Sequence, residues 1–269
     1  MSDKNLTPYF LAIGPLLLVG AYMNWPASDL IGMRGTDSLI GEADSLMPLL
    51  IMATLGTLMV LGGLYLLISD MMSSATGMNK QLLSIASVLV VLTMAFFVTG
   101  MGSNVSVINF EEAEIDDDED EAYTFDSAAD QQASQRMAFE TGNTVWQMSP
   151  VTWGLSLVLV GLVAFMTKRP ESAMDYVLPA LMPVGTLFLS VPIINDPGMF
   201  AMVFPVVLLV HVIIGGLMLA GKVSLPECCR GRCLKWIKLK KILNPKIWLI
   251  IIRFTPRGLV GTILQTDWA

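Results

Sequence analysis

Charged residues are scarce in this chain and are missing altogether from six long stretches. Asp, Glu, Lys and Arg make up 14% of the 269 residues, whereas a soluble domain has about 25%. The uncharged stretches are residues 5–28, 45–69, 81–110, 141–167, 176–195 and 197–221. Each reaches roughly the 20 residues that an α-helix needs to cross the hydrocarbon core of a bilayer. The sequence therefore predicts an all-α, polytopic membrane helix bundle with about six transmembrane helices.

Residues that carry chemistry are equally sparse. The chain has one histidine and three cysteines, and it contains no HExxH, P-loop, GxGxxG or CxxCH motif. Ion-coupled transport usually leaves acids or bases inside the crossings, and the six stretches have none. We therefore expect no catalytic residues, no cofactor, no metal site and no nucleic-acid partner, and we predict that the chain is not an enzyme.

The charges between the stretches separate by sign. If each stretch crosses the membrane, one side holds the N-terminus, residues 70–80 and 168–175 and the tail from residue 222, with a net charge of +8. The other side has −15, and together they give the −7 of the chain. Because Lys and Arg near helix ends stay inside, both termini are predicted to be cytoplasmic. A cleaved signal peptide in place of the first crossing remains open.

These patterns divide the chain into four predicted parts. The first three transmembrane helices fall in residues 1–101, an acidic extracytoplasmic loop in 102–148, the last three helices in 149–221, and a basic cytoplasmic or interfacial tail in 222–269. Nine of the eleven residues in 111–121 are acidic. An EF-hand is disfavoured, because Glu121 stands where Gly is required and Ser127 where a bidentate Glu belongs.

We interpret the acidic run at 111–121 as a solvated, self-repelling and mobile linker. We also predict that residues 102–148 contribute little to the folding of the membrane domain. A cation site or a site for a basic partner is the alternative. A short surface helix is predicted over residues 123–140.

The basic tail begins with all three cysteines, which stand at positions 228, 229 and 233. Cys228, Cys229 and Cys233 suit S-acylation beside basic residues, with free thiols as the alternative, and zinc would lack a fourth ligand. The ten basic residues of the tail are expected to bind anionic lipid. The abrupt change in composition leaves open a fused or out-of-frame end.

The fifth crossing contains Pro179, Pro183 and Pro192, so its helix should break. The missing N–H of Pro183 is expected to leave the Pro179 carbonyl without its helical partner, to be met by packing or by water in a cavity. In the sixth crossing, His211 is expected to bind Ser190, Thr186 or a backbone carbonyl, in a helix-packing or pore-lining role.

Small and aromatic residues predict where the helices meet each other and the interface. Glycine lets membrane helices approach closely, and tryptophan favours the membrane surface. The residues concerned are Gly56, Gly62, Gly63, Gly154, Gly161, Gly215 and Gly216, with Trp25, Trp146 and Trp153 near the outer helix ends.

The function predicted from these features is that of a non-catalytic membrane protein: an accessory, assembly or scaffolding subunit that contacts lipid and other membrane subunits. The alternative is a transporter or channel for an uncharged substrate, built around the fifth helix with its prolines. A membrane enzyme ranks last, since the crossings are apolar.

Overall fold

A computed structural model describes residues 6–25, 36–41, 43–113, 125–167, 171–194 and 197–223. All of them lie in the compact unit Met1–Pro226; the second unit, Glu227–Ala269, lies outside the described residues. Over the described part the chain is all-helical and has no strand. The elements are α1 (Thr7–Met23), α2 (Thr36–Gly41), α3 (Ala43–Ser74), α4 (Gly77–Glu112), α5 (Ala128–Trp146), α6 (Ser149–Thr167), η1 (Ala173–Tyr176), α7 (Leu181–Ile194) and α8 (Pro197–Leu219).

Five helical segments of the described part are long and apolar enough to cross a membrane. They are Ala43–Ser74, Gly77–Glu112, Ala128–Thr167, Ala173–Ile194 and Gly198–Leu219. The sixth apolar helix, α1, is shorter, with 17 residues. The prediction of an apolar helical bundle is therefore confirmed, with five spans by length and composition.

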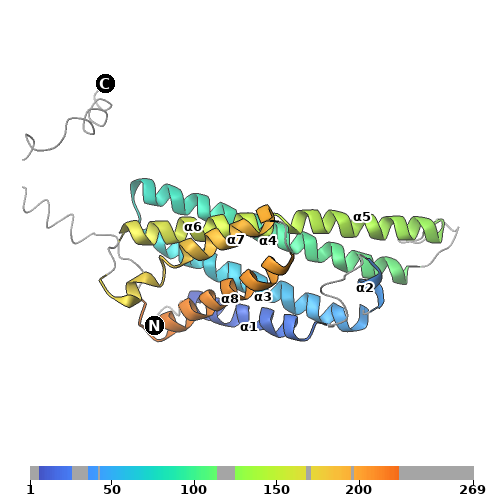
Figure 1. The fold of residues 1–269 in the computed structure, drawn as a ribbon, viewed down its shortest axis with the longest axis horizontal. Helices are drawn as coiled ribbons and strands as arrows, with labels where there is room; N and C mark the ends of the chain where they lie inside the picture. Colours follow the sequence, from blue (N-terminus) through green and yellow to red (C-terminus); the bar gives the residue numbers. More distant parts are fainter. Residues whose placement is uncertain are drawn as a thin grey trace, which may run out of the picture. The chain divides into compact units, whose positions relative to one another are not determined.

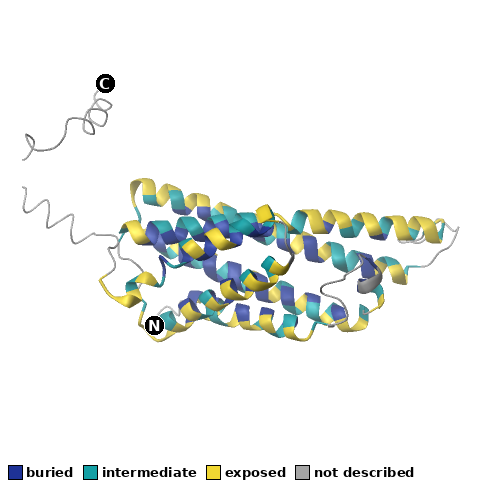
Figure 2. Ribbon diagram, viewed as in Figure 1, coloured by how far each residue is buried: buried dark blue, intermediate teal, exposed yellow. Residues whose placement is uncertain are grey.

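Six helices form a closed series of neighbours (Figure 1). α1 packs on α3, α3 on α4, α4 on α6, α6 on α7, α7 on α8, and α8 packs back on α1. One hydrophobic cluster draws buried side chains from all six, among them Leu18, Leu64, Val90, Leu157 and Leu208. Figure 2 shows these buried positions on the inward faces of the helices and exposed positions on the outward faces. Apolar residues on the outward faces are what a lipid-embedded bundle requires.

Glycines set the closest approaches between the helices. A Cβ added to Gly154 on α6 would lie 2.8 Å from the carbonyl oxygen of Gly185 on α7. A Cβ on Gly56 of α3 would lie 3.0 Å from the Gly14 carbonyl oxygen on α1. At each of these positions a side chain would meet the backbone of the neighbouring helix, so only glycine permits the observed spacing.

The expected glycine contacts divide into two groups. Close approach is confirmed for Gly56, Gly63, Gly154, Gly161 and Gly215. At Gly62 a Cβ would make only ordinary contact with Phe10, 3.5 Å away, and at Gly216 it would meet nothing within 4 Å. For these last two the expectation is wrong, because they face away from the packed interface.

The adjacent pair Gly215 and Gly216 gives a matched test. A Cβ on Gly215 would lie 2.7 Å from the Ala12 nitrogen and 2.8 Å from the Pro8 oxygen. We expect Gly215→Ala to destabilise the bundle by about 1–3 kcal/mol through overpacking. Gly216→Ala should be neutral or slightly stabilising, since alanine favours helix. Thermal unfolding of both variants in detergent measures this, and equal stabilities would contradict the α1–α8 contact.

α4 and α5 continue the bundle well beyond a membrane's thickness. α4 has 36 residues, about 54 Å of helix against about 30 Å of hydrocarbon. Its last turns pack with α5, α2 and the start of α3, and Figure 1 shows these four segments together at one end. We call this assembly, made of residues 36–41, 43–50, 101–112 and 128–146, the acidic extension.

The acidic extension has its own apolar core, which bears on the expectation for residues 102–148. One cluster contains Leu39, Leu46 and Val107, and a second contains Leu50, Phe97, Met101 and Ile108. Much of the expected acidic loop is thus packed helix, at 102–112 and 128–146, which weighs against the expectation that 102–148 contributes little to folding. The acidic residues at 114–121 lie outside the described residues. The predicted helix at 123–140 is found as Ala128–Trp146.

Candidate functional site

His211 lies at the centre of the bundle, on the inward face of α8, and is 1% exposed. Its Nδ1 lies 2.7 Å from the carbonyl oxygen of Val207, one turn earlier in the same helix. Ser190 and Thr186 donate instead to carbonyls of their own helix, those of Leu187 and Met182. Of the partners considered for His211, the structure therefore shows a backbone carbonyl, and one that does not join two helices.

An aromatic cluster from three helices includes Trp153, which contacts this histidine. The ring of Trp153 on α6 lies 5.7 Å from the His211 ring, centroid to centroid, in a T-shaped arrangement at 70°. Trp153 also contacts Phe188 of α7 and Phe204 of α8 edge-on, at 5.6 and 6.2 Å. With 1% of its surface exposed, Trp153 is a core residue. The expectation that it sits at the membrane surface is wrong, because its inward-facing position on α6 outweighs its place near the helix start.

Two buried nitrogens in this centre have no hydrogen-bond partner among the described residues: Nε2 of His211 and Nε1 of Trp153. The carbonyl of Val207 can only accept, so Nδ1 of His211 must carry the hydrogen. In the neutral ring Nε2 is then an acceptor, whereas the indole Nε1–H of Trp153 is only a donor. The site therefore presents one acceptor and one donor that have no partner among the described residues, on two side chains whose rings are in contact.

Thr57 on α3 adds a third buried polar atom near the same depth. It is fully buried, and its Oγ1 has no partner among the described residues. Its neighbour Gly56 packs on α1 beside Leu18. Gly215 of α8 packs on α1 at Ala12. His211 precedes Gly215 by one helical turn and therefore lies on the same face of α8. Since α8 runs antiparallel to α1, His211 lies level with the residues of α1 that follow Ala12. The central polar residues thus come from α3, α6 and α8.

In the proline segment of the fifth crossing, a backbone hydrogen bond within the segment meets the Pro179 carbonyl. Pro179 lies in a turn that follows η1, and its carbonyl accepts a hydrogen bond from the N–H of Met182, at 3.0 Å. The helical partner that proline removes at position 183 is absent as predicted, but the replacement differs from the prediction, because the N–H of Met182 in a tight turn meets the carbonyl in place of packing or water. Pro183 falls in the first turn of α7. The N–H groups of a first turn have no acceptor within the helix, so proline at this position costs α7 no helical hydrogen bond. The side chain of Pro183 is exposed. The break precedes the helix and does not interrupt it.

Glutamine side chains of α5 hold the end of α4 in the acidic extension. Nε2 of Gln131 donates to the carbonyls of Phe110, at 2.7 Å, and Ala113, at 3.3 Å. Nε2 of Gln135 donates to the Glu111 carboxylate at 2.9 Å. The last carbonyls of a helix have no partner within it, so Gln131 acts as a side-chain cap for α4. The sequence analysis did not identify either glutamine.

We expect Gln131→Ala to loosen the end of α4 by about 1 kcal/mol, the net value of such a hydrogen bond. Gln132→Ala is the matched control, because Gln132 is the neighbouring, exposed glutamine. Amide hydrogen exchange of residues 105–113 measures the effect, which should be faster exchange in the first variant only. Unchanged exchange in both variants would show that the cap contributes nothing.

The remaining candidate residues are not brought to this site. Cys228, Cys229, Cys233 and the basic tail lie outside the described residues. Within the part of the chain that the structure describes, no three His, Cys, Asp or Glu side chains are grouped as a metal ion would require. The buried polar side chains of this part are Thr7, Thr36, Thr57, Thr93, Gln135, Ser149, Ser156 and His211, all of them uncharged types or the one histidine.

The comparisons with known proteins add no relative. No protein-family model, no curated protein and no solved structure matches this chain.

Proposed function

We propose that this chain is a non-catalytic, multi-pass integral membrane protein that serves as an accessory, assembly or scaffolding subunit. The observation that carries the proposal is the acidic extension, a packed helical structure continuous with the apolar bundle through α3 and α4. A rigid extension of this kind presents a fixed surface to a partner. A solvated linker would have to be ordered at a cost in entropy when it bound.

The surface of the acidic extension suits a partner with a basic segment. Its exposed charged residues include Glu112, Asp130 and Glu140, against the single Arg136, and the exposed Asp126 stands just before α5. Charge complementarity of this type steers association and selects the partner's sign. Further acids stand at 114–121 in the sequence. The partner we propose is another membrane subunit whose segment on this side is rich in Lys and Arg.

We also propose that α1 is a sixth crossing and that both termini are cytoplasmic. α1 runs antiparallel to α3, since Oγ1 of Thr7 bonds Asp70 near the end of α3 at 3.3 Å and Gly14 packs on Gly56. At its other end Tyr22 meets Phe204, at 5.4 Å, in the first third of α8. The helix therefore extends alongside two apolar spans. The side assignment rests on the +8 and −15 charge division.

In this proposal the basic tail lies against anionic lipid, and the protein's partners are the bilayer and other membrane subunits. The transporter alternative rested on the proline segment. Two observations weigh against it: the Pro179 carbonyl is bonded by Met182, and α7 packs directly on α6 at Gly185 and Gly154.

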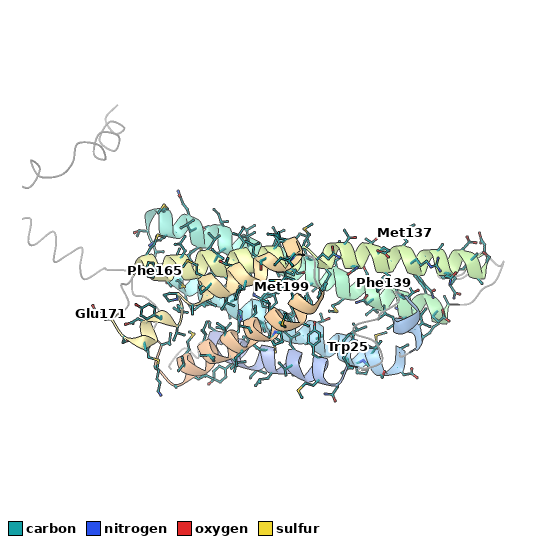
Figure 3. The ribbon with its side chains drawn as sticks, viewed as in Figure 1. Trp25, Met137, Phe139, Phe165, Glu171 and Met199 are labelled. Atoms are coloured by element: carbon teal, nitrogen blue, oxygen red, sulfur yellow. The ribbon has the colours of Figure 1, made fainter. Side chains whose placement is uncertain are left out.

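Affinity purification of the full chain from its native membrane tests the proposal. We expect one or more membrane subunits to co-purify in fixed stoichiometry. Replacing Glu112, Asp126, Glu140 and the acids at 114–121 by their amides should release that partner while the thermal stability stays unchanged. Glu171→Gln, at the opposite end of the bundle from α5 (Figure 3), is the control and should retain it. Purification of the chain alone, in full yield and without a partner, would contradict the proposal.

A further inference from the structure

The two unpaired nitrogens at the bundle centre are chemically complementary. Burying a polar group without a hydrogen bond costs about 1–3 kcal/mol, and a membrane offers no bulk water to relieve it. Nε2 of His211 needs a donor and Nε1–H of Trp153 needs an acceptor. They make no direct hydrogen bond to each other, although their rings are in edge-to-face contact with centroids 5.7 Å apart.

We propose that a single internal water molecule bridges His211 and Trp153. Its oxygen accepts the hydrogen bond from Nε1–H of Trp153, and one of its hydrogens is donated to Nε2 of His211. Two hydrogen bonds of about 2.9 Å through one oxygen join nitrogens up to about 6 Å apart, and the two side chains are direct neighbours, with 5.7 Å between their ring centroids. The ligand class is thus a small neutral hydroxyl that donates once and accepts once.

The surroundings of the pair fix this chemistry. Phe188 and Phe204 contact Trp153 edge-on, so the surroundings of the indole on these sides are apolar. No acid, lysine or arginine is among the buried side chains of the described residues, so a charged ligand would lack a counter-charge. Buried waters commonly have a third partner, and Thr57 on α3 is a further buried residue whose Oγ1 has no hydrogen-bond partner among the described residues.

Because His211 is the only histidine of the chain, the site can be observed without substitutions. The full-length protein is labelled with ¹⁵N-histidine and reconstituted in deuterated lipid, so that the protons outside the protein belong to water. Water-edited solid-state NMR should show a protonated Nδ1 and an unprotonated Nε2 that receives magnetisation from water. No transfer from water to Nε2, or a proton on Nε2, would overturn the proposal.

Two variants then identify the second partner of the water. Trp153→Phe keeps the aromatic packing but removes the donor, and should abolish the transfer from water to Nε2 and shift that resonance. Trp146→Phe removes the other buried indole that lacks a partner and should leave the signal unchanged. If Trp153→Phe also leaves it unchanged, the bridge is wrong. ¹⁵N-indole labelling of the unsubstituted chain reads the Trp153 side independently should that variant fail to fold.

Discussion

The arrangement of the apolar helices depends on a few places where one helix backbone rests directly on another. In lipid, helices gain no hydrophobic free energy by associating, so close packing must hold them together. Gly14 and Gly56 bring α1 onto α3, Gly154 and Gly185 bring α6 onto α7, and Gly215 brings α8 onto α1. These contacts join helices distant in sequence into the closed series of neighbours, and the central site exists only because that series closes.

The acidic extension and the central polar site follow from the same helices. Since α4 runs without interruption from Gly77 to Glu112, the face that packs in the bundle continues into the extension. In the extension, glutamine side chains cap α4, and a small apolar core packs the helices of a segment that is otherwise highly charged. At the other extreme, the centre of the bundle keeps His211 and Trp153 fully buried, and both must be satisfied locally. The same set of helices thus exposes charged side chains in the acidic extension and buries polar side chains at the centre of the bundle.

The apolar helices could be predicted from the sequence because length and the absence of charge suffice for them. Contacts between helices depend on which face of each helix packs on its neighbour, and amino-acid composition does not determine that face. The sequence therefore could not distinguish Gly215 from Gly216. The cluster that joins Val107 to Leu39 was not predicted, because the high net charge of residues 102–148 favoured a segment with little part in folding. Trp153 was misplaced because proximity to a helix end was taken as proximity to the membrane surface. Pro183 lost its expected effect once the helix began at Leu181.

We propose that α4 carries the chain through the membrane, from the turn before Gly77 to the acidic extension. Met78, at the start of α4, is 62% exposed, and Met137, on the outward side of α5 (Figure 3), is 71% exposed. With Cys228, Cys229 and Cys233 first replaced by serine, Met78→Cys and Met137→Cys can each be labelled by a membrane-impermeant thiol reagent in sealed vesicles. We expect the two positions to be labelled from opposite sides of the membrane, with position 137 labelled from the side that faces away from the cytoplasm. Labelling of both from the same side would contradict it.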